Sequence, residues 1–237
     1  MTAELFNPLE EVRRRRLIIN RLDAWLYEEI RPHLGCRILE VGSGHGNFIQ
    51  HLLDRDLVVA TDIEPSSVEL VRQKFAGCDH VQVRVHDIRD PVDDELRAFR
   101  LDTVVSLNVL EHIEDDVAAL SNMADMLWAG GRVILIVPAH EWLYGTMDSS
   151  IGHLRRYTKR TMAHKLERAG LAVEKQFYLN VLGVLGWLVN GRLLRQTVPP
   201  SGQLEWFNRI VPVASWVERR IRPPIGLSLV SVARKRA

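Results

Sequence analysis

The alternation of strand and helix patterns predicts an α/β fold built on a mostly parallel sheet. Short apolar runs of strand length recur along the chain, and segments with helical spacing of apolar side chains separate them. Strands that alternate with helices form βαβ units, whose sheet is parallel and covered by helices on both faces. The expected strands are residues 37–41, 57–61, 81–85, 103–107, 132–137, 171–178 and 227–233.

The expected helices lie between these strands. Apolar residues recur at helical spacing over residues 10–30, and Pro32 ends that run. After the second strand, Ser66 and Glu69 have the spacing of a capping box, which predicts a helix start there. Residues 158–169 form a further predicted helix that begins with a threonine and stops at a glycine.

Composition narrows the classes of function. Of the 237 residues, 46% are hydrophobic and 26% are charged, which suffices for a packed core. The formal net charge is only +1, so no global positive field attracts nucleic acid or a membrane. Cys36 and Cys78 are too few for a disulfide framework and lack zinc-ligand spacing. The first residues lack a signal-peptide pattern, and the apolar stretch at 181–189 is too short to cross a bilayer. We therefore expect a cytoplasmic protein.

Residues just after the strands form the candidate cofactor site. In open α/β sheets, ligands bind beyond the carboxyl ends of the strands, near the point where the strand order reverses. Gly42, Gly44 and Gly46 follow the first strand, where residues without side chains let the backbone approach a ligand and open the next helix. Asp62 follows the second strand, where a carboxylate accepts hydrogen bonds from ribose hydroxyls. Asp87 follows the third strand and is placed to accept from an adenine amino group.

This pattern resembles the class I S-adenosylmethionine-dependent methyltransferases over roughly residues 35–175. The G-x-G-x-G run after Glu40 is similar to the loop that holds the methionine part of the cofactor in that family, and residues 108–113 are similar to the segment beneath it. The resemblance is closest to the small-molecule branch that includes the quinone-biosynthesis O-methyltransferases. It implies a doubly wound, Rossmann-like sheet of seven strands with the last strand antiparallel, and S-adenosylmethionine as cofactor. The residues expected to bind the cofactor are Glu40, Gly42, Ser43, Gly44, Gly46, Asp62, Ile63, Asp87, Ile88, Asn108 and Val109.

Three histidines near the ends of the fourth and fifth strands are the candidate catalytic residues. The sulfonium of this cofactor already activates the methyl group, so the protein mainly has to align the acceptor and exclude water. An oxygen nucleophile must also lose a proton, and histidine titrates near neutral pH. The candidates are His112, His140 and His153, with His153 favoured because arginines and a tyrosine follow it. Positioning without a base is the alternative.

The segment around His153 also supplies candidate contacts to the acceptor. Arginine favours bidentate contacts with carboxylate or phosphate, so Arg155 or Arg156 is expected to hold an anionic group or to close a lid. No metal site is expected, because the acidic run at residues 114–116 opens a helix, where carboxylates interact favourably with the helix dipole. The predicted acceptor-binding residues are Tyr144, Arg155, Arg156, Tyr157 and Trp187.

Residues 181–226 form an unusually long connection between the last two strands. Apolar helical stretches at 181–195 and 203–217 contain most of this segment, and six arginines against two glutamates give it a local net charge of +4. We consider four roles: a structural hairpin, a homodimer contact, a lid over a bulky apolar acceptor, and a peripheral contact with a membrane surface, which accommodates both Trp and Arg. The tryptophans in it are Trp187, Trp206 and Trp216.

We interpret the chain as a single methyltransferase domain acting on a small-molecule or lipid-like acceptor, by preference at oxygen. Its expected parts are an N-terminal helical cap (1–34), a cofactor-binding core (35–180), the helical insertion (181–226), and the last strand with a tail (227–237). Alternatives are a cyclisation on the same fold and a non-catalytic cofactor-binding partner. A nucleic-acid substrate is disfavoured by the charge and by the absence of an Asn/Asp-Pro-Pro-Tyr element after the fourth strand. Arg13–Arg16 is expected to be solvated, with contact to the cofactor carboxylate or an anionic surface as the alternative.

Overall fold

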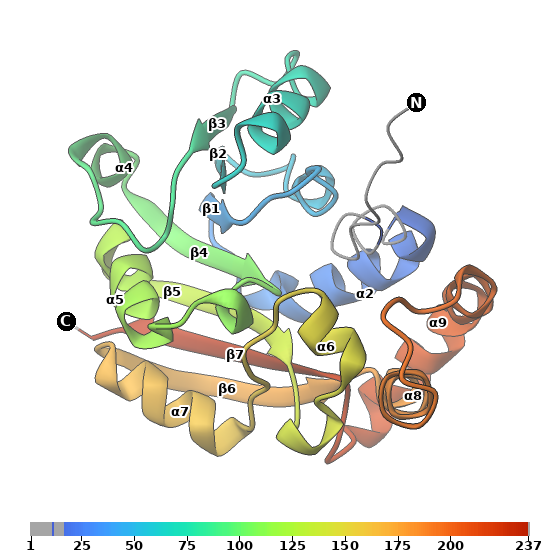
Figure 1. The fold of residues 1–237 in the computed structure, drawn as a ribbon. Coiled ribbons are helices and arrows are strands. Elements are labelled where there is room, and N and C mark those ends of the chain that lie inside the picture. The colour runs from blue at the N-terminus through green and yellow to red at the C-terminus, as the bar shows by residue number, and fades with distance from the viewer. Residues whose placement is uncertain (1–10, 12–16, 237) are drawn as a thin grey trace.

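The computed structural model describes residue 11 and residues 17–236, and Arg13–Arg16 lies outside this part. A seven-stranded sheet runs through the molecule in the order β3-β2-β1-β4-β5-β7-β6 (Figure 1). The last strand, β7, lies between β5 and β6 and pairs antiparallel with both, whereas the other neighbouring pairs are parallel. This confirms the predicted fold class. The strands are β1 (Arg37–Val41), β2 (Leu57–Asp62), β3 (Val81–Val85), β4 (Leu101–Leu107), β5 (Leu127–Pro138), β6 (Leu171–Leu179) and β7 (Ser228–Lys235).

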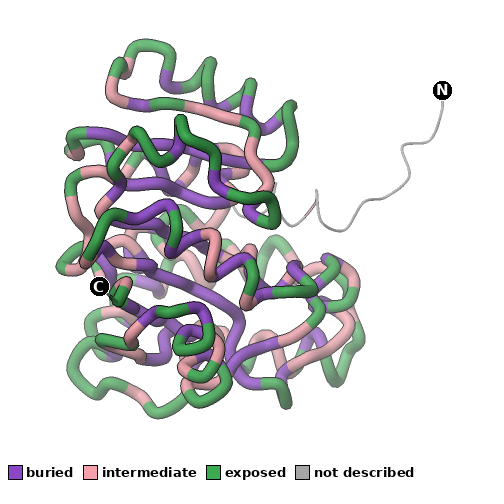
Figure 2. The backbone as a smooth tube through the Cα atoms, turned by 90° about the vertical axis from the view of Figure 1, so that its left-hand side faces the viewer, coloured by how far each residue is buried: buried purple, intermediate pink, exposed green. Residues whose placement is uncertain are grey.

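Helices cover both faces of this sheet and create two apolar layers. One layer packs β-strand side chains against α4, α5 and α7, and the other packs the opposite face against α2, α3 and α9. Figure 2 shows the resulting pattern, with buried residues concentrated in the middle of the molecule and exposed residues around it. The longer helices are α2 (Asn20–Ile30), α3 (Pro65–Lys74), α5 (Asp116–Met126), α7 (Lys159–Arg168), α8 (Val181–Trp187) and α9 (Ser201–Ile221), with shorter α4 (Asp94–Ala98) and α6 (Thr146–Ser150).

Short 3₁₀ and π helices complete the described secondary structure. Two of them, η3 and η4, follow β1 and β4, and they carry the chain past the carboxyl ends of the sheet where the strand order reverses. They are η1 (Leu17–Ile19), η2 (Arg31–His33), η3 (Ile49–His51), η4 (Leu110–His112), η5 (Glu141–Leu143) and the π-helical η6 (Leu188–Leu193).

Two sequence predictions about helix starts are wrong. The glycine run after β1 opens no α-helix, because turns and the 3₁₀ helix η3 follow it, with Ile49 and Leu52 fully buried. Helix α3 is capped at Glu64 rather than by a box at Ser66, because Pro65 has a fixed φ and needs no backbone donor at the first helical position. In contrast, the predicted Thr158 cap of α7 is confirmed: its hydroxyl accepts a hydrogen bond from Thr161 N.

The insertion is helical, as its apolar periodicity predicts. It consists of α8, η6 and α9, and α9 lies beside α2 in Figure 1. Arg219 Nε of α9 donates to Glu29 of α2 over 2.6 Å. The buried Glu218 carboxylate accepts from the backbone amides of Asn180 and Val181, both at 2.8 Å, which holds the start of α8 against α9. Among the described helices, none is long and apolar enough to cross a bilayer.

Candidate active site

A cavity of about 420 Å³ opens at the carboxyl ends of β1, β2 and β4. The reversal of strand order between β1 and β4 separates the segments that follow these strands, which makes room for a ligand. Ten of the eleven residues predicted to bind the cofactor line this cavity: Glu40, Gly42, Ser43, Gly44, Asp62, Ile63, Asp87, Ile88, Asn108 and Val109. The exception, Gly46, packs the loop onto α3, because a Cβ there would lie 2.9 Å from the Phe75 ring.

The glycine loop has backbone conformations that favour glycine. The φ angles are +72° at Gly42, +50° at Gly44 and +68° at Gly46, in the left-handed region that other residues rarely adopt. A Cβ on Gly42 would lie 2.4 Å from Val109 Cγ2, whereas a Cβ on Gly44 would have no atom within 4 Å. The side of Gly44 that would carry a side chain is therefore open space beside the cavity.

Asp62 holds this loop in place. Its Oδ2 accepts a hydrogen bond from Gly44 N over 2.8 Å, and its Oδ1 accepts from Glu64 N over 3.0 Å. The amides of Gly42 and Ser43 donate to Thr61 O at 2.8 and 2.9 Å. The carboxylate predicted from its distance along the chain thus has a structural role before any ligand binds.

The cavity wall carries acceptors suited to a ligand rich in hydrogen-bond donors. Glu40 and Asp62 are both buried in it, and Asp87 lies at its rim beside Ile88. The Arg89 side chain donates to Asp87 and lowers the pKa of that carboxyl. Ser43 Oγ is buried without a hydrogen-bond partner among the described residues. An amino acid with an attached nucleoside supplies ammonium, hydroxyl and amino donors, so these residues fit such a ligand.

The comparisons with known proteins agree with this geometry. A family model described as "Methyltransferase domain" matches residues 39–133, which include the glycine loop, Asp62, Asp87 and the segment after β4. The chain is 27% identical over 180 residues to the ubiquinone biosynthesis O-methyltransferase of Xanthomonas euvesicatoria pv. vesicatoria (strain 85-10), a match that covers 69% of this chain and 72% of that protein.

These matches support a class I S-adenosylmethionine-dependent methyltransferase. Its sequence relatives differ in what they methylate or modify. A tRNA U34 carboxymethyltransferase of Alteromonas mediterranea (strain DSM 17117 / CIP 110805 / LMG 28347 / Deep ecotype) is 27% identical over 124 residues, which are 47% of this chain and only 36% of that protein. This methyltransferase thus spans about a third of the length of one relative and most of the other.

Solved structures share the fold across nearly the whole chain. A geranyl diphosphate methyltransferase in complex with SAM superposes with a TM-score of 0.66 and 15% identity, covering 94% of this chain and 90% of that one. The [4+2]-cyclase SpnF superposes with a TM-score of 0.60 and 16% identity, covering 92% of this chain and 81% of that one. At these identities the likeness establishes the methyltransferase fold alone.

Two of the three candidate histidines of the methyltransferase reach the cavity. His112 at the end of η4 and His153 after α6 both line it, with their ring centroids 4.8 Å apart. His153 Nδ1 lies 2.8 Å from Asp148 Oδ1, and His153 Nε2 lies 3.5 Å from Glu111 Oε1. Both carboxylates are fully buried, so the imidazole of His153 lies between two acids in a place from which water is largely excluded.

The structure places His140 elsewhere. It follows β5 with a φ of +61°, and its ring packs 4.5 Å from the ring of Tyr178, outside the residues that line the cavity. Burial, and then the positive charge of Arg156, lower the pKa of His140 and favour its neutral form. Its catalytic role stays a prediction, without a contact to the cavity that supports it.

The five predicted acceptor-binding side chains are engaged within the protein instead. Arg155 donates to Glu114 O and pairs with Asp116, and the Tyr157 hydroxyl also lies 3.0 Å from Asp116. The other three meet around Asp148 and His153: Arg156 Nε and Trp187 Nε1 donate to Asp148 at 2.9 Å, and Tyr144 Oη donates to His153 O at 2.7 Å. None of the five lines the cavity, so their predicted contact with an acceptor stays a prediction.

Two buried acids at this site are absent from the sequence-based prediction. Asp148 accepts hydrogen bonds from His153, Arg156, Trp187 and Gly145 N, and is the centre of the cluster behind the cavity. Glu111 is buried so completely that the loss of solvation raises its pKa to about 7. Each acid is close in sequence to a candidate histidine: Glu111 directly precedes His112, and Asp148 lies five positions before His153. This proximity is the signal that could have identified them.

Asp62 allows a direct test of the cofactor site. Asp62→Ala is expected to weaken binding of S-adenosylhomocysteine by about 1–3 kcal/mol, because the loop loses the acceptor for Gly44 N and the ligand loses a charged acceptor. Isothermal titration calorimetry measures this change. Asp79→Ala removes an exposed carboxylate away from the cavity and is the matched control. Equal affinities for the two variants would contradict the placement.

Proposed function

We propose that this chain transfers a methyl group from S-adenosylmethionine to an oxygen of a small-molecule or lipid-like acceptor that enters beside His112 and His153. The observation that carries the proposal is the pairing of His153 Nδ1 with Asp148. A carboxylate at Nδ1 favours the tautomer that carries its proton there, so Nε2 presents a lone pair at the cavity. An imidazole held in this orientation beside the cofactor cavity is suited to accept a proton from an acceptor hydroxyl.

In this proposal, one set of residues binds the cofactor and His153 accepts the proton from the acceptor hydroxyl. When bound, S-adenosylmethionine supplies a methyl group on a positively charged sulfur; the acceptor oxygen forms the new bond to carbon as the carbon–sulfur bond breaks. Glu40, Asp62 and the glycine loop hold the cofactor in this proposal, and Ile113 and Ile151 exclude water from the region beside the histidines. His153 Nε2 takes the hydroxyl proton. Asp148 and Glu111 stabilise the imidazolium that forms.

The preference for a lipid-like acceptor is supported by the insertion. Exposed apolar side chains gather on α8, η6 and α9, and basic residues on α9 flank them, among them Arg219 and Arg220. Such a surface suits a peripheral contact with a lipid interface, from which an apolar acceptor is delivered. Residues 181–226 do not contribute to the cavity lining, so the lid role has less support than this surface role. The most exposed members are Leu185, Leu193, Leu194, Trp206, Val213, Trp216 and Ile221.

The alternative functions require different properties of this site. A cyclisation would need no proton acceptor at the cavity, and the likeness to the cyclase SpnF keeps this alternative open. A tRNA substrate is kept open by the carboxymethyltransferase relatives, although the near-zero net charge gives no general field for RNA. A non-catalytic partner would retain cofactor binding without turnover.

The histidines distinguish these functions in a methylation assay. An acceptor screen that follows formation of S-adenosylhomocysteine is expected to find a hydroxylated acceptor. On that acceptor, His153→Ala should lower kcat by about 10²- to 10⁴-fold, because the proton acceptor is lost. Affinity for S-adenosylhomocysteine should change little.

A paired variant separates catalysis from folding in this test. His164→Ala removes an exposed histidine on α7 and should retain kcat. Turnover in His153→Ala equal to that of the wild type would exclude the histidine base and leave positioning as the mechanism.

A further inference from the structure

Glu111 is in an unusual environment for a carboxylate. Its side chain is 0% exposed, and neither carboxylate oxygen has a hydrogen-bond partner among the described residues. A buried ionised group without partners is strongly destabilising. It has an ionisable neighbour in His153, whose Nε2 lies 3.5 Å from Oε1. In the proposed proton transfer this carboxylate acts only through His153 and has no contact of its own with the acceptor.

His153 Nε2 is the imidazole nitrogen that faces this carboxylate. The other nitrogen, Nδ1, pairs with Asp148, which is fixed by Arg156 and Trp187, so Nε2 is the nitrogen placed to act as a ligand. A carboxylate bonded to one imidazole nitrogen while the other faces a cation is the usual arrangement around protein-bound metals. Around His153, Asp148 thus has the place of a supporting carboxylate and Glu111 that of a second metal ligand.

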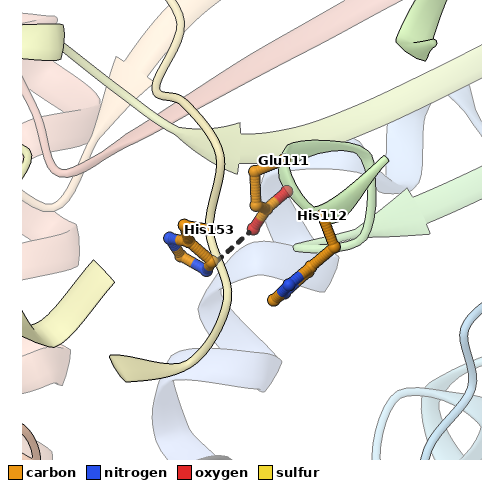
Figure 3. A group of neighbouring side chains, drawn as sticks. All are labelled: Glu111, His112 and His153. Atoms are coloured by element: carbon orange, nitrogen blue, oxygen red, sulfur yellow. Dashed lines mark ion pairs between the residues drawn. The ribbon is translucent and has the colours of Figure 1, made fainter. Parts of the chain in front are cut away.

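His112 completes a set of three donors. Its Nδ1 lies 3.2 Å from Gly152 O, which orients the ring, and one of its ring nitrogens lies close enough to the other two side chains to serve as a ligand. One ligand atom from each of Glu111, His112 and His153 lies within 4.8 Å of the others. Figure 3 shows the three side chains, with Glu111 and His112 from the turn after β4 and His153 from the segment after α6, converging on one space.

The distances suit a transition metal after a small contraction. Zinc binds histidine nitrogen and carboxylate oxygen at about 2.0–2.2 Å, so its ligand atoms lie roughly 3–4 Å apart. The 3.5 Å between His153 Nε2 and Glu111 Oε1 is already in this range. Two imidazoles and one carboxylate form the ligand set of catalytic zinc sites that keep a position open.

We propose that Glu111, His112 and His153 bind a divalent transition-metal cation such as Zn²⁺, with its open position toward the cofactor cavity. The cation would neutralise the buried carboxylate. The open position would take an oxygen of the acceptor and lower the pKa of its hydroxyl, in place of direct proton removal by His153. This last step rests on the proposed methyl transfer, whereas the binding of the cation does not.

Metal binding by the full chain tests the proposal without an acceptor. Protein freed of metal with a chelator is titrated with Zn²⁺ by calorimetry, and Co²⁺ binding is followed by its visible absorption. One site per chain is expected. Glu111→Gln should weaken Zn²⁺ binding by more than the ~10- to 100-fold typical for loss of a supporting residue, because it removes a ligand. His112→Ala should do the same.

Folding and cofactor binding are controlled separately. Glu111→Gln keeps the shape of the side chain and removes a buried carboxylate, so the metal-free variant should melt no lower than wild type and should bind S-adenosylhomocysteine. His164→Ala, an exposed histidine outside the cluster, should retain Zn²⁺ affinity.

Several results would overturn the site. Absence of stoichiometric Zn²⁺ or Co²⁺ binding to the wild type, with S-adenosylhomocysteine still bound, would exclude the cation and leave the proposed function untouched. Zn²⁺ affinity unchanged in Glu111→Gln would locate the metal elsewhere. Failure of S-adenosylhomocysteine binding alongside intact Zn²⁺ binding would instead contradict the proposed function.

Discussion

Replacing Asp148 with alanine is expected to lower the free energy of unfolding by about 3–5 kcal/mol, because it leaves a buried guanidinium without its counter-charge. Arg156 is 2% exposed, its Nε donates to Asp148 Oδ1 over 2.9 Å, and its Nη2 forms an ion pair with the same oxygen at 2.9 Å. The same carboxylate accepts from Trp187 Nε1 and from Gly145 N. Its loss therefore also loosens the contact between α6 and α8. Urea denaturation followed by far-UV circular dichroism measures the change.

Two further variants test whether the loss of stability depends on the position of the carboxylate and on its charge. Asp125→Ala removes an exposed carboxylate from α5 and should change stability by under about 0.5 kcal/mol. Asp148→Asn retains one acceptor oxygen, replaces the other with an NH2 donor and removes the charge, so its effect should lie between those of Asp125→Ala and Asp148→Ala. A loss below about 1 kcal/mol in Asp148→Ala would show that Arg156 finds another partner and that the cluster is not a structural centre.

The fold could be predicted from the sequence because its signals are local. Each apolar run from β1 to β7 is bounded by turn residues within a few positions, so the strands differ from their predicted ranges mainly at the ends. The largest difference is β5, which begins at Leu127 and pairs Leu127 with Leu101 before its regular register starts at Arg132. That extension depends on a neighbouring strand, which apolar patterning does not reveal.

The same difference between local and long-range signals decides which parts of the site could be predicted. Gly42, Gly44 and Asp62 lie just after or at strand ends, so their spacing along the chain placed them in one cavity. The partners of His153 lie 5 and 42 positions away, and an acid such as Glu111 looks like a solvated turn residue until the fold buries it. Arg156 shows the reverse case: its type suggests an anionic ligand, the fold supplies Asp148 as a buried counter-charge, and its contact with an acceptor stays a prediction.

Gly44→Val is expected to abolish binding of S-adenosylhomocysteine, with a loss of affinity of more than ~100-fold. Gly44 lines the cavity, and a side chain there would extend into space that contains no protein atom within 4 Å of its Cβ. A β-branched residue at a φ of +50° is also a backbone outlier, which shifts the amide that donates to Asp62. Calorimetry measures the affinity, and thermal melting measures the strain.

Gly170→Val is the control that separates backbone strain from occlusion of the cavity. Both glycines have a positive φ, but only Gly44 lines the cavity. Gly170 ends α7 with a φ of +76°, and a Cβ there also has no atom within 4 Å. Both variants should melt lower by a similar amount, since left-handed backbone disfavours valine by about 1–2 kcal/mol. Only Gly44→Val should lose the ligand. If Gly170→Val weakens binding equally, the loss reflects general destabilisation; if Gly44→Val retains binding, the cofactor lies elsewhere than over the glycine loop.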